Sequence, residues 1–417
     1  MGGYIRRFAD QILQKRLDSA GAVLIQGSKG CGKTETASQI AKSTARLDVD
    51  GDVRVRMEVD PKSVLEGDVP RLIDEWQEYP QIWNYVRREV DDRKKKGLFI
   101  LTGSANPEER ARMHSGAGRI STFRMRPMSL YERGWSSGEV SLFSLTHGDA
   151  PKSGQVDFSL ESLAEKLTLG GWPALIGADG QEALRFMQDY VALLAEIDIS
   201  RVSDKKRDPQ KVMRLLKSLA RNVATEASAV SLAKDASGAE RSVGDETVAG
   251  YIEALERLMA LEQLPAWAPH IRSSDTLRKA PKRHFVDPSL AIGALGLSAG
   301  KLLGDLSFFG FLFESLVVRD LRIYAEVHDG SVFHYRDSRG AELDAVIEFP
   351  DGSWSAFEVK MGFTAQDEAA ASLLKFAEKI DQGKMGAPAS LNVITATGFA
   401  HRRKDGVNVV PLQVLTA

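Results

Sequence analysis

Eight consecutive residues near the N-terminus have the types and spacing that would hold a phosphate chain. They read G-S-K-G-C-G-K-T and match the pattern G-x-x-x-x-G-K-T. Glycines let successive backbone N–H groups close on phosphate oxygens. Lys33 would reach the β and γ phosphates of ATP, and the Thr34 hydroxyl would ligate Mg²⁺. The alternative is a glycine-rich turn without a ligand. The predicted ATP site consists of Gly27, Ser28, Lys29, Gly30, Cys31, Gly32, Lys33 and Thr34.

A second acidic motif follows an apolar run. The segment Arg71-Leu72-Ile73-Asp74-Glu75 resembles a Walker B element, a strand that ends in two carboxylates. Asp74 would hold the magnesium shell, and Glu75 would orient and polarise the attacking water. A pair of acids after apolar residues is often only a solvated loop, but a preceding phosphate loop favours the catalytic interpretation.

Two further positions are candidates for contact with the γ-phosphate. Thr102 or Ser104, at the end of the next apolar run, would sense this group, and we favour Ser104. Capping of a following helix explains either hydroxyl equally well. Arg119 stands where an arginine finger of a neighbouring subunit would stabilise charge in the transition state. The alternative is an ordinary solvated arginine.

The C-terminal part carries a different set of charges. Glu314 lies in an amphipathic segment, Asp344 ends the string A-E-L-D, and Glu358 and Lys360 belong to F-E-V-K. Side chains of a strand repeat every two residues, so Glu358 and Lys360 share a face. Two carboxylates and a lysine suit phosphodiester cleavage with a second Mg²⁺ or Mn²⁺ ion. They predict a restriction-endonuclease-like, PD-(D/E)xK-type domain, although a half-exposed charged hairpin would give the same string.

The elements that must position these residues begin with alternating strands and helices. Apolar runs at 22–25, 71–73 and 98–101 predict strands, and 34–47 and 83–95 predict helices. This alternation is typical of a parallel sheet with crossover helices. Polar residues collect after each strand, where open α/β sheets bind ligands. A helical segment at 161–199, broken at 170–173 by Gly-Gly-Trp-Pro, predicts a small lid.

The middle of the chain predicts three helices and a hairpin, the outline of a winged helix. The helices cover 211–223, 228–236 and 246–260, and the strands cover 261–266 and 284–286. Acidic residues on the third helix (Asp245, Glu246, Glu253 and Glu256) would repel phosphates, so a protein-packing role is the alternative to DNA binding. The candidate phosphate contacts are Lys205, Lys206, Arg207, Lys211, Arg214, Lys217, Arg221, Arg278, Lys279, Lys282 and Arg283.

The last part of the sequence predicts a separate α/β domain. A helix at 308–324 precedes strand-like runs at 332–335, 342–349 and 354–359. A helix at 367–379 and a β-rich run at 391–394 follow.

The length and amino-acid composition limit which of these interpretations are possible. The chain has 417 residues, enough for two or three domains, and 43% hydrophobic and 27% charged residues, as in ordinary globular proteins. Its formal net charge of −2 restricts any nucleic-acid site to a local surface. The single Cys31 excludes a disulfide framework. With neither a signal peptide nor a membrane-spanning run, we expect a cytoplasmic protein without membrane contact.

Long motifs across the chain resemble a known family, the bacterial and archaeal AAA-type ATPases that carry the domain of unknown function 4143, and more closely their actinobacterial branch. The motifs are G-S-K-G-C-G-K-T-E-T-A, P-R-L-I-D-E-W-Q, F-I-L-T-G-S-A, H-S-G-A-G-R-I, R-M-R-P-M-S-L and F-L-F-E-S-L. The resemblance implies an AAA-type ATPase, a winged helix and a restriction-endonuclease-like C-terminal domain. It also implies the roles given to Lys33, Thr34, Asp74 and Glu75, and no redox role for Cys31.

These observations predict an α/β protein with four parts. They are a P-loop ATPase core at 1–150, a helical lid at 151–200, a winged helix at 201–295 and the C-terminal domain at 296–417. The first hypothesis is a Mg²⁺-dependent ATPase associated with DNA, whose nucleotide state drives the C-terminal half. Alternatives are an ATP-gated DNA nuclease and a non-enzymatic ATP switch that controls protein interactions. Arg119 would imply a homo-oligomer.

Overall fold

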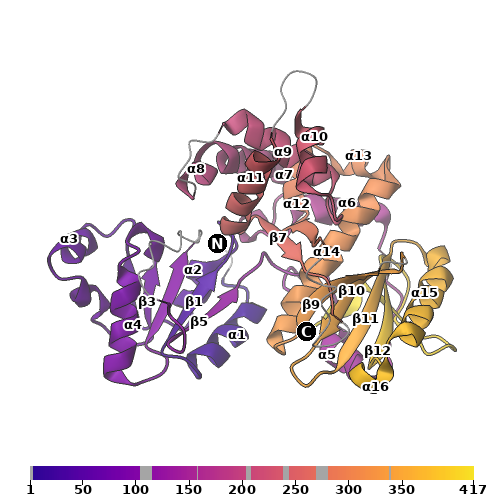
Figure 1. Ribbon diagram of the computed structural model, residues 1–417, viewed down its shortest axis with the longest axis horizontal. Helices are drawn as coiled ribbons and strands as arrows, with labels where there is room; N and C mark the ends of the chain where they lie inside the picture. Colours follow the sequence, from indigo (N-terminus) through magenta and orange to yellow (C-terminus); the bar gives the residue numbers. More distant parts are fainter. Residues whose placement is uncertain are drawn as a thin grey trace. The chain divides into compact units, whose positions relative to one another are not determined.

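The computed structural model describes residues 3–103, 115–156, 158–202, 208–237, 244–268, 280–337 and 340–417. The chain divides into two compact units, which are described separately (Figure 1). The first unit consists of Met1–Pro127, Ile197–Lys206 and Glu253–Ala260. The second consists of Met128–Glu196, Arg207–Ile252 and Leu261–Ala417. Residues 128–150, which we predicted to be part of the ATPase core, fall in the second unit.

A parallel sheet forms the centre of the first unit, as predicted. Its strand order is β2-β3-β4-β1-β5, and every neighbouring pair is parallel. The strands are β1 (Ala22–Gln26), β2 (Ser43–Arg46), β3 (Arg71–Asp74), β4 (Phe99–Gly103) and β5 (Ile120–Arg124). Because β4 lies between β1 and β3, the ends of these three strands form one continuous edge.

Helices complete the first unit. They are α1 (Phe8–Leu17), α2 (Lys33–Ser38), α3 (Gly51–Val59) and α4 (Ile82–Arg93). The predicted helix at 34–47 is wrong, because α2 ends at Ser38 and the chain then forms β2. Ala45 is buried there and β2 pairs with β3, so sheet pairing overrides the helical pattern. Helix α3 and strand β5 were not predicted.

The helical part of the second unit follows the predicted order. Helix α6 ends at Leu169, and the helical pattern resumes beyond the predicted break at 170–173. Helix α12 packs against α6, α7 and α9, and α9 packs against α10. The helices are α5 (Leu142–Thr146), α6 (Leu160–Leu169), α7 (Gly180–Leu193), α9 (Pro209–Arg221), α10 (Ala229–Ser237), α12 (Ser289–Leu295) and α13 (Ala299–Leu303). Helix α11 (Asp245–Arg257) is followed by the antiparallel pair β7 (Leu261–Leu264) and β8 (Lys282–Phe285).

A six-stranded mixed sheet, with the order β13-β14-β12-β11-β10-β9, forms the C-terminal part of the second unit. Strands β9 (Ser331–Arg336), β10 (Glu342–Glu348) and β11 (Trp354–Lys360) are antiparallel, and β12 (Ser390–Thr395) is parallel to β11. Helix α14 (Leu306–Val327) precedes these strands, and α15 (Gln366–Lys379) connects β11 to β12. The remaining elements are α16 (Gln382–Met385), β13 (His401–Arg402) and β14 (Asn408–Pro411).

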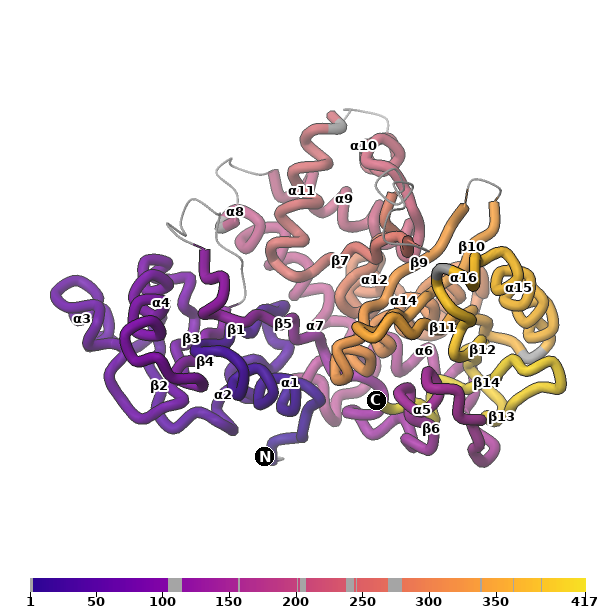
Figure 2. The backbone as a smooth tube through the Cα atoms, turned by 60° about the horizontal axis from the view of Figure 1, so that its bottom comes forward, coloured from indigo at the N-terminus to yellow at the C-terminus, as the bar shows by residue number. Residues whose placement is uncertain are grey.

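Aromatic packing fixes the C-terminal sheet. Trp267 and Trp354 are each 1% exposed, and their ring centroids lie 4.9 Å apart. Phe376 of α15 joins the same cluster, so the helix is held against the sheet. The chain ends in β15 (Leu415–Thr416), which pairs with β6 (Val140–Ser141), and Figure 2 shows the C-terminus beside β6 and α5.

No helix in the described part of the chain has the length and apolar character needed to cross a membrane.

Candidate functional site

The predicted phosphate loop joins β1 to α2 in the first unit. Gly30 and Gly32 have φ angles of 73° and 104°, which glycine adopts more readily than other residues. The Lys33 side chain is buried and donates to the carbonyl oxygens of Gly27 and Ser28, at 2.9 and 3.0 Å. Lys33 is therefore folded over the loop. Helix α2 has six residues, so the loop amides and Lys33 have to supply most of the positive potential.

One buried polar atom of this loop has no protein partner. Among the described residues, Ser28 Oγ is buried without a hydrogen-bond partner. A buried hydroxyl usually has one, so this atom fits a loop that receives phosphate oxygens. Cys31 is fully buried, with Sγ 3.5 Å from the carbonyl oxygen of Met125, and has a packing role.

The phosphate loop and the acidic motif after β3 meet at one edge of the sheet. Thr34 Oγ1 donates to Asp74 Oδ1 at 3.0 Å. Thr102, at the end of β4, donates to the same carboxylate oxygen. Asp74 is 6% exposed, so β3 presents a buried carboxylate to the hydroxyl that we expected to share magnesium with it. These residues fit a magnesium ion at this position, since carboxylate and hydroxyl oxygens are ligands that Mg²⁺ accepts.

Glu75 directly follows β3 in a left-handed conformation, with φ at 52°. The Gln77 side-chain amide donates to the Glu75 carboxylate and so fixes its direction. A Cβ atom on Gly103 would lie 2.4 Å from Gln77 Oε1 and 3.0 Å from Trp76 Nε1. Gly103 therefore lets the turn after β3 approach the end of β4. Gln77 was not among the predicted site residues, although it ends the string P-R-L-I-D-E-W-Q.

Lys29 of the loop has a partner that the sequence did not indicate. Its ammonium pairs with Asp198 at the end of the π-helical turn Leu194–Asp198. The Asp198 side chain is 10% exposed. A segment far along the chain thus contacts the phosphate loop within the first unit.

Arg119 lies at the other edge of the sheet. Its carbonyl oxygen accepts from the amide of Ala22, which begins β1, whereas the phosphate loop follows the end of β1. Arg119 Nε donates to Asp91 Oδ1 of α4 at 2.8 Å. In its own chain, Arg119 is therefore directed away from the loop. Ser104, the favoured sensor, lies outside the described residues.

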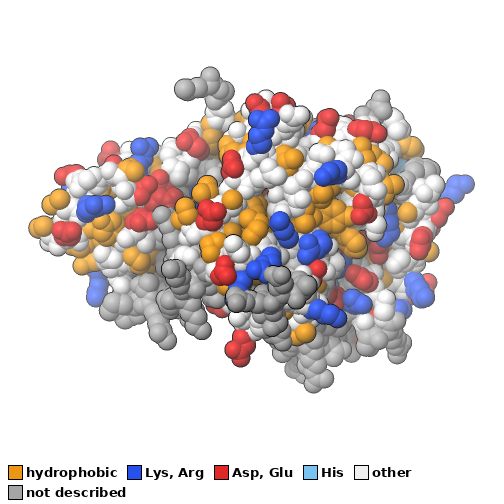
Figure 3. All heavy atoms as spheres, turned by 90° about the horizontal axis from the view of Figure 1, so that it is seen from above, with side chains coloured by type: hydrophobic (Ala, Val, Ile, Leu, Met, Phe, Trp, Pro, Cys, Tyr) orange, Lys and Arg blue, Asp and Glu red, His pale blue; other side chains and the backbone are white. Residues whose placement is uncertain are grey.

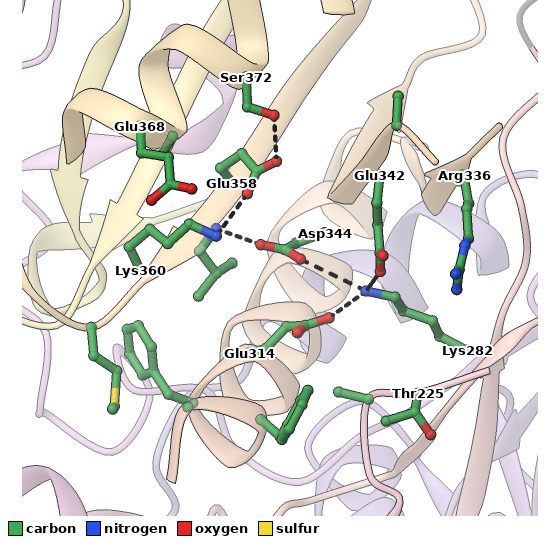
Figure 4. A pocket seen from close by; sticks show the side chains of 18 of the residues that line it. Thr225, Lys282, Glu314, Arg336, Glu342, Asp344, Glu358, Lys360, Glu368 and Ser372 are labelled. Atoms are coloured by element: carbon green, nitrogen blue, oxygen red, sulfur yellow. Dashed lines mark hydrogen bonds and ion pairs between the residues drawn. The ribbon is translucent and has the colours of Figure 1, made fainter. Parts of the chain in front are cut away.

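The four predicted C-terminal residues converge on one cavity in the second unit. Glu314 of α14, Asp344 of β10 and Glu358 and Lys360 of β11 all line a cavity of about 970 Å³ (Figure 4). Lys360 Nζ lies 3.1 Å from Glu358 Oε2, so the two side chains share a face as expected. Asp344 Oδ2 accepts from the Val359 amide at 2.7 Å. The fold therefore brings the four predicted side chains to one cavity, and their role stays a prediction.

Lys282 is the main residue of this cavity that sequence reasoning misplaced. We predicted a DNA contact in the wing, but its side chain is 4% exposed and lies among carboxylates. Lys282 Nζ is 2.9 Å from Glu314 Oε1, 2.9 Å from Glu342 Oε1 and 3.7 Å from Asp344 Oδ1. Figure 4 shows the ammonium between these three side chains. No local motif could reveal this, because β8, α14 and β10 are separate in sequence.

Burial controls the protonation of this cavity. Burial, together with the nearby Asp344, raises the pKa of Glu314 to about 8. The same two causes raise the pKa of Glu358 to about 7. Burial alone would also raise the pKa of Glu342, but the Lys282 ammonium outweighs it and lowers that pKa. At neutral pH, bound protons therefore neutralise part of the negative charge of these carboxyl groups, and the Lys282 ammonium neutralises another part.

The predicted second metal site finds no support in this arrangement. Within the described ranges, no group of three or more His, Cys, Asp or Glu side chains is placed to hold a metal ion. Glu314 and Asp344 each place a carboxylate oxygen near the Lys282 ammonium, and Glu358 pairs with Lys360.

Two of the other predicted DNA contacts have partners within the chain. Arg221 pairs with Asp235 at 2.7 Å, and Arg283 donates to the carbonyl oxygen of Ala227. Figure 3 shows acidic and basic side chains interspersed over one face of the molecule. Lys205, Lys206, Arg207, Arg278 and Lys279 lie outside the described residues.

A parallel sheet with a phosphate loop and a facing acidic motif defines a P-loop nucleoside triphosphatase fold. Comparison with protein families agrees. Residues 19–133 match an AAA domain, residues 160–301 match the domain of unknown function 8612, and residues 309–415 match the domain of unknown function 4143. The chain thus carries an N-terminal AAA domain and a C-terminal domain of unknown function 4143, as the resemblance predicted.

Two solved structures show distant similarity to this chain. The Walker-type ATPase PABY2304 of Pyrococcus abyssi shares 12% identity at a TM-score of 0.43, over 70% of this chain and 96% of its own. A STAND protein with a tetratricopeptide repeat sensor, PH0952 of Pyrococcus horikoshii, shares 12% identity at a TM-score of 0.23, over 78% of this chain and 48% of its own. At these scores neither structure guides an argument about this chain. No curated protein matches it.

Proposed function

We propose that the first unit hydrolyses ATP in a Mg²⁺-dependent reaction. The observation that carries this proposal is the 3.0 Å hydrogen bond between Thr34 Oγ1 and Asp74 Oδ1. It brings together the two groups that phosphate-loop ATPases use to hold magnesium, from motifs that are far apart in sequence. The AAA domain match supports the same assignment.

Each residue has one role in this proposal. Backbone amides from Gly27 to Gly32 bind the phosphates, and Lys33 moves from the loop carbonyls to the β and γ phosphates. Thr34 and Asp74 would hold Mg²⁺, which when bound neutralises phosphate charge. Glu75, directed by Gln77, orients the attacking water and accepts its proton. A carboxylate in this position favours turnover over the alternative of a pure switch.

The change Glu75→Gln tests this role. We expect phosphate release to fall about 100-fold or more, as for loss of a general base, while ATP binding persists. Glu78→Gln is the matched control, because Glu78 is exposed in the same turn. Unchanged turnover in Glu75→Gln would leave the non-enzymatic switch as the better interpretation.

Phosphodiester cleavage in the C-terminal part is the second candidate function. The observation that favours it is the convergence of Glu314, Asp344, Glu358 and Lys360 on one cavity. The order of a helix, three antiparallel strands, a helix and a parallel strand supports a restriction-endonuclease-like fold. Lys360 would steady or deprotonate the attacking water. Cleavage of plasmid or oligonucleotide DNA that is lost on Asp344→Ala would support this candidate, and absence of cleavage on all substrates would remove it.

Association with DNA through a winged helix is part of the same proposal. Lys211, Arg214 and Lys217 of α9 remain as candidate phosphate contacts. If they bind phosphates, DNA affinity falls as salt rises, and Lys217→Ala reduces that dependence by about one counterion. DNA binding without salt dependence would contradict this role. We also keep the predicted division into four parts and a cytoplasmic location as proposals.

A homo-oligomer with Arg119 acting between subunits is a further part of the proposal. In such an assembly, mixing Arg119→Ala and Lys33→Ala chains would restore turnover at mixed interfaces. Mixtures that show only the sum of the separate activities would contradict it.

A further inference from the structure

The position of Lys282 shows a cation built into the carboxylate cluster of the cavity. Its ammonium contacts Glu314 of α14 and Glu342 of β10 at 2.9 Å each, and Asp344 lies 3.7 Å away. A lysine ammonium has three N–H donors and no acceptor, so it can satisfy several carboxylates at once. The side chain is 4% exposed, which excludes a role in solvent or on a DNA surface.

Burial of this ammonium is favourable only because these carboxylates surround it. A buried charge costs several kcal/mol in real proteins unless opposite charges and hydrogen bonds compensate it. The carboxylates raise the pKa of Lys282 despite its burial, so the lysine is held as a cation. The same oxygens are ligands that Mg²⁺ and Mn²⁺ prefer. An ammonium and a divalent ion would therefore compete for one position.

Lys282 comes from a different part of the chain than the carboxylates. It belongs to β8, within the match to the domain of unknown function 8612, whereas Glu314, Glu342 and Asp344 lie within the match to the domain of unknown function 4143. The β7–β8 hairpin is tied to α14, because Arg322 pairs with Glu262 of β7 and donates to the carbonyl oxygen of Gln263 at 2.6 Å. The hairpin thus holds the lysine in the cluster.

We infer that Lys282 is an internal counter-ion that fills the space among Glu314, Glu342 and Asp344, so that these carboxylates do not bind Mg²⁺ or Mn²⁺ in the folded chain. The inference concerns the same cavity as the second candidate function but does not depend on DNA cleavage.

Mn²⁺ binding to the full chain without nucleotide, followed by electron paramagnetic resonance, tests the inference. We expect Lys282→Met to bind one Mn²⁺ ion about 10-fold more tightly than the wild type does at this site, and Lys282→Met/Asp344→Asn to lose the gain. Lys282→Arg is the matched control, because it keeps the cation and is expected to behave as the wild type. Equal Mn²⁺ affinity in Lys282→Met and the wild type would overturn the inference.

If removal of the lysine unfolds the protein, a second variant and a second measurement still test the inference. Lys282→Gln keeps a hydrogen-bonding group at the same position and provides a second variant. If both variants unfold, Mn²⁺ is added to them. Recovery of the folded state by Mn²⁺ supports a shared position for lysine and metal, and no recovery overturns it. Because the readout is metal binding, a failure of DNA cleavage would remove the nuclease candidate without deciding this result.

Discussion

The two sites of this protein differ in how their charges are brought together. In the first unit, the phosphate loop is one continuous segment, Asp74 ends strand β3 and Glu75 follows it directly. In the second unit, the cavity collects single side chains from β8, α14, β10 and β11. The first arrangement can be recognised from local spacing. The second depends on the fold, so local spacing revealed four of its residues and misplaced Lys282.

The largest effect that we expect is on the stability of the second unit, which contains a buried network of charged side chains. Arg319 is fully buried in the second unit, where it pairs with Asp287 at 2.6 Å and with Asp320 at 2.7 Å. Arg319→Met leaves both carboxylates buried without their cation, so we expect it to lower the free energy of unfolding by about 3–5 kcal/mol. Chemical denaturation with probes in each unit would measure this.

A surface pair gives the matched control for that change. Arg403 pairs with Asp367, whose side chain is 87% exposed, and with Asp405. Both pairs lie at the surface, so Arg403→Met should cost less than about 1 kcal/mol. Equal losses in the two variants would show that the buried network contributes no more than a solvated pair.

The next largest effect concerns ATP turnover, which should depend on the carboxylate of the first site and not on that of the second. Asp74 accepts hydrogen bonds from Thr34 and Thr102, and Asp74→Asn removes the charge that magnesium requires. We expect ATP turnover to fall about 100-fold. Asp344→Asn changes a carboxylate of the other site and should leave turnover, measured without DNA, within about twofold. A comparable loss in Asp344→Asn would mean that the cavity contributes to ATP hydrolysis.

A smaller effect is a pH dependence confined to the second unit. The folded-state pKa values of Glu314 and Glu358 are about 8 and about 7, above the value of roughly 4.3 for an unfolded chain. The folded state therefore keeps protons that the unfolded state has released. Stability should fall as pH rises from about 6.5 to about 8, by roughly 2–5 °C in melting temperature. Below this range the buried His284, whose pKa is lowered by burial, has the opposite effect. Glu314→Gln should flatten this profile, and a variant with the wild-type slope would contradict the assignment.

The smallest effect concerns Arg119. Its ion pair with Asp91 is exposed to solvent, so Asp91→Asn should leave the free energy of unfolding close to the wild-type value. If Arg119 acts between subunits, Asp91→Asn frees the guanidinium and turnover is retained, whereas Arg119→Ala loses it. Equal turnover in both variants and the wild type would leave Arg119 with a structural role alone.

Particular residues show how far the sequence alone could lead. The strands around the phosphate loop and the helices of the middle part were predictable, because apolar periodicity and glycine breaks are local signals. The segment at 34–47 was not, because Ala45 becomes buried only when β2 pairs with β3. Gln77 and Asp198 could not be assigned either, since their roles depend on contacts that form in the folded chain.

Phosphate release from ATP by the wild type and by Lys33→Ala tests the central claim most directly. Lys33 is the loop residue that should leave the carbonyl oxygens of Gly27 and Ser28 for the phosphates. The account predicts Mg²⁺-dependent release by the wild type and release at background level by the folded Lys33→Ala chain. Release that persists unchanged in Lys33→Ala would contradict an ATPase site in this loop.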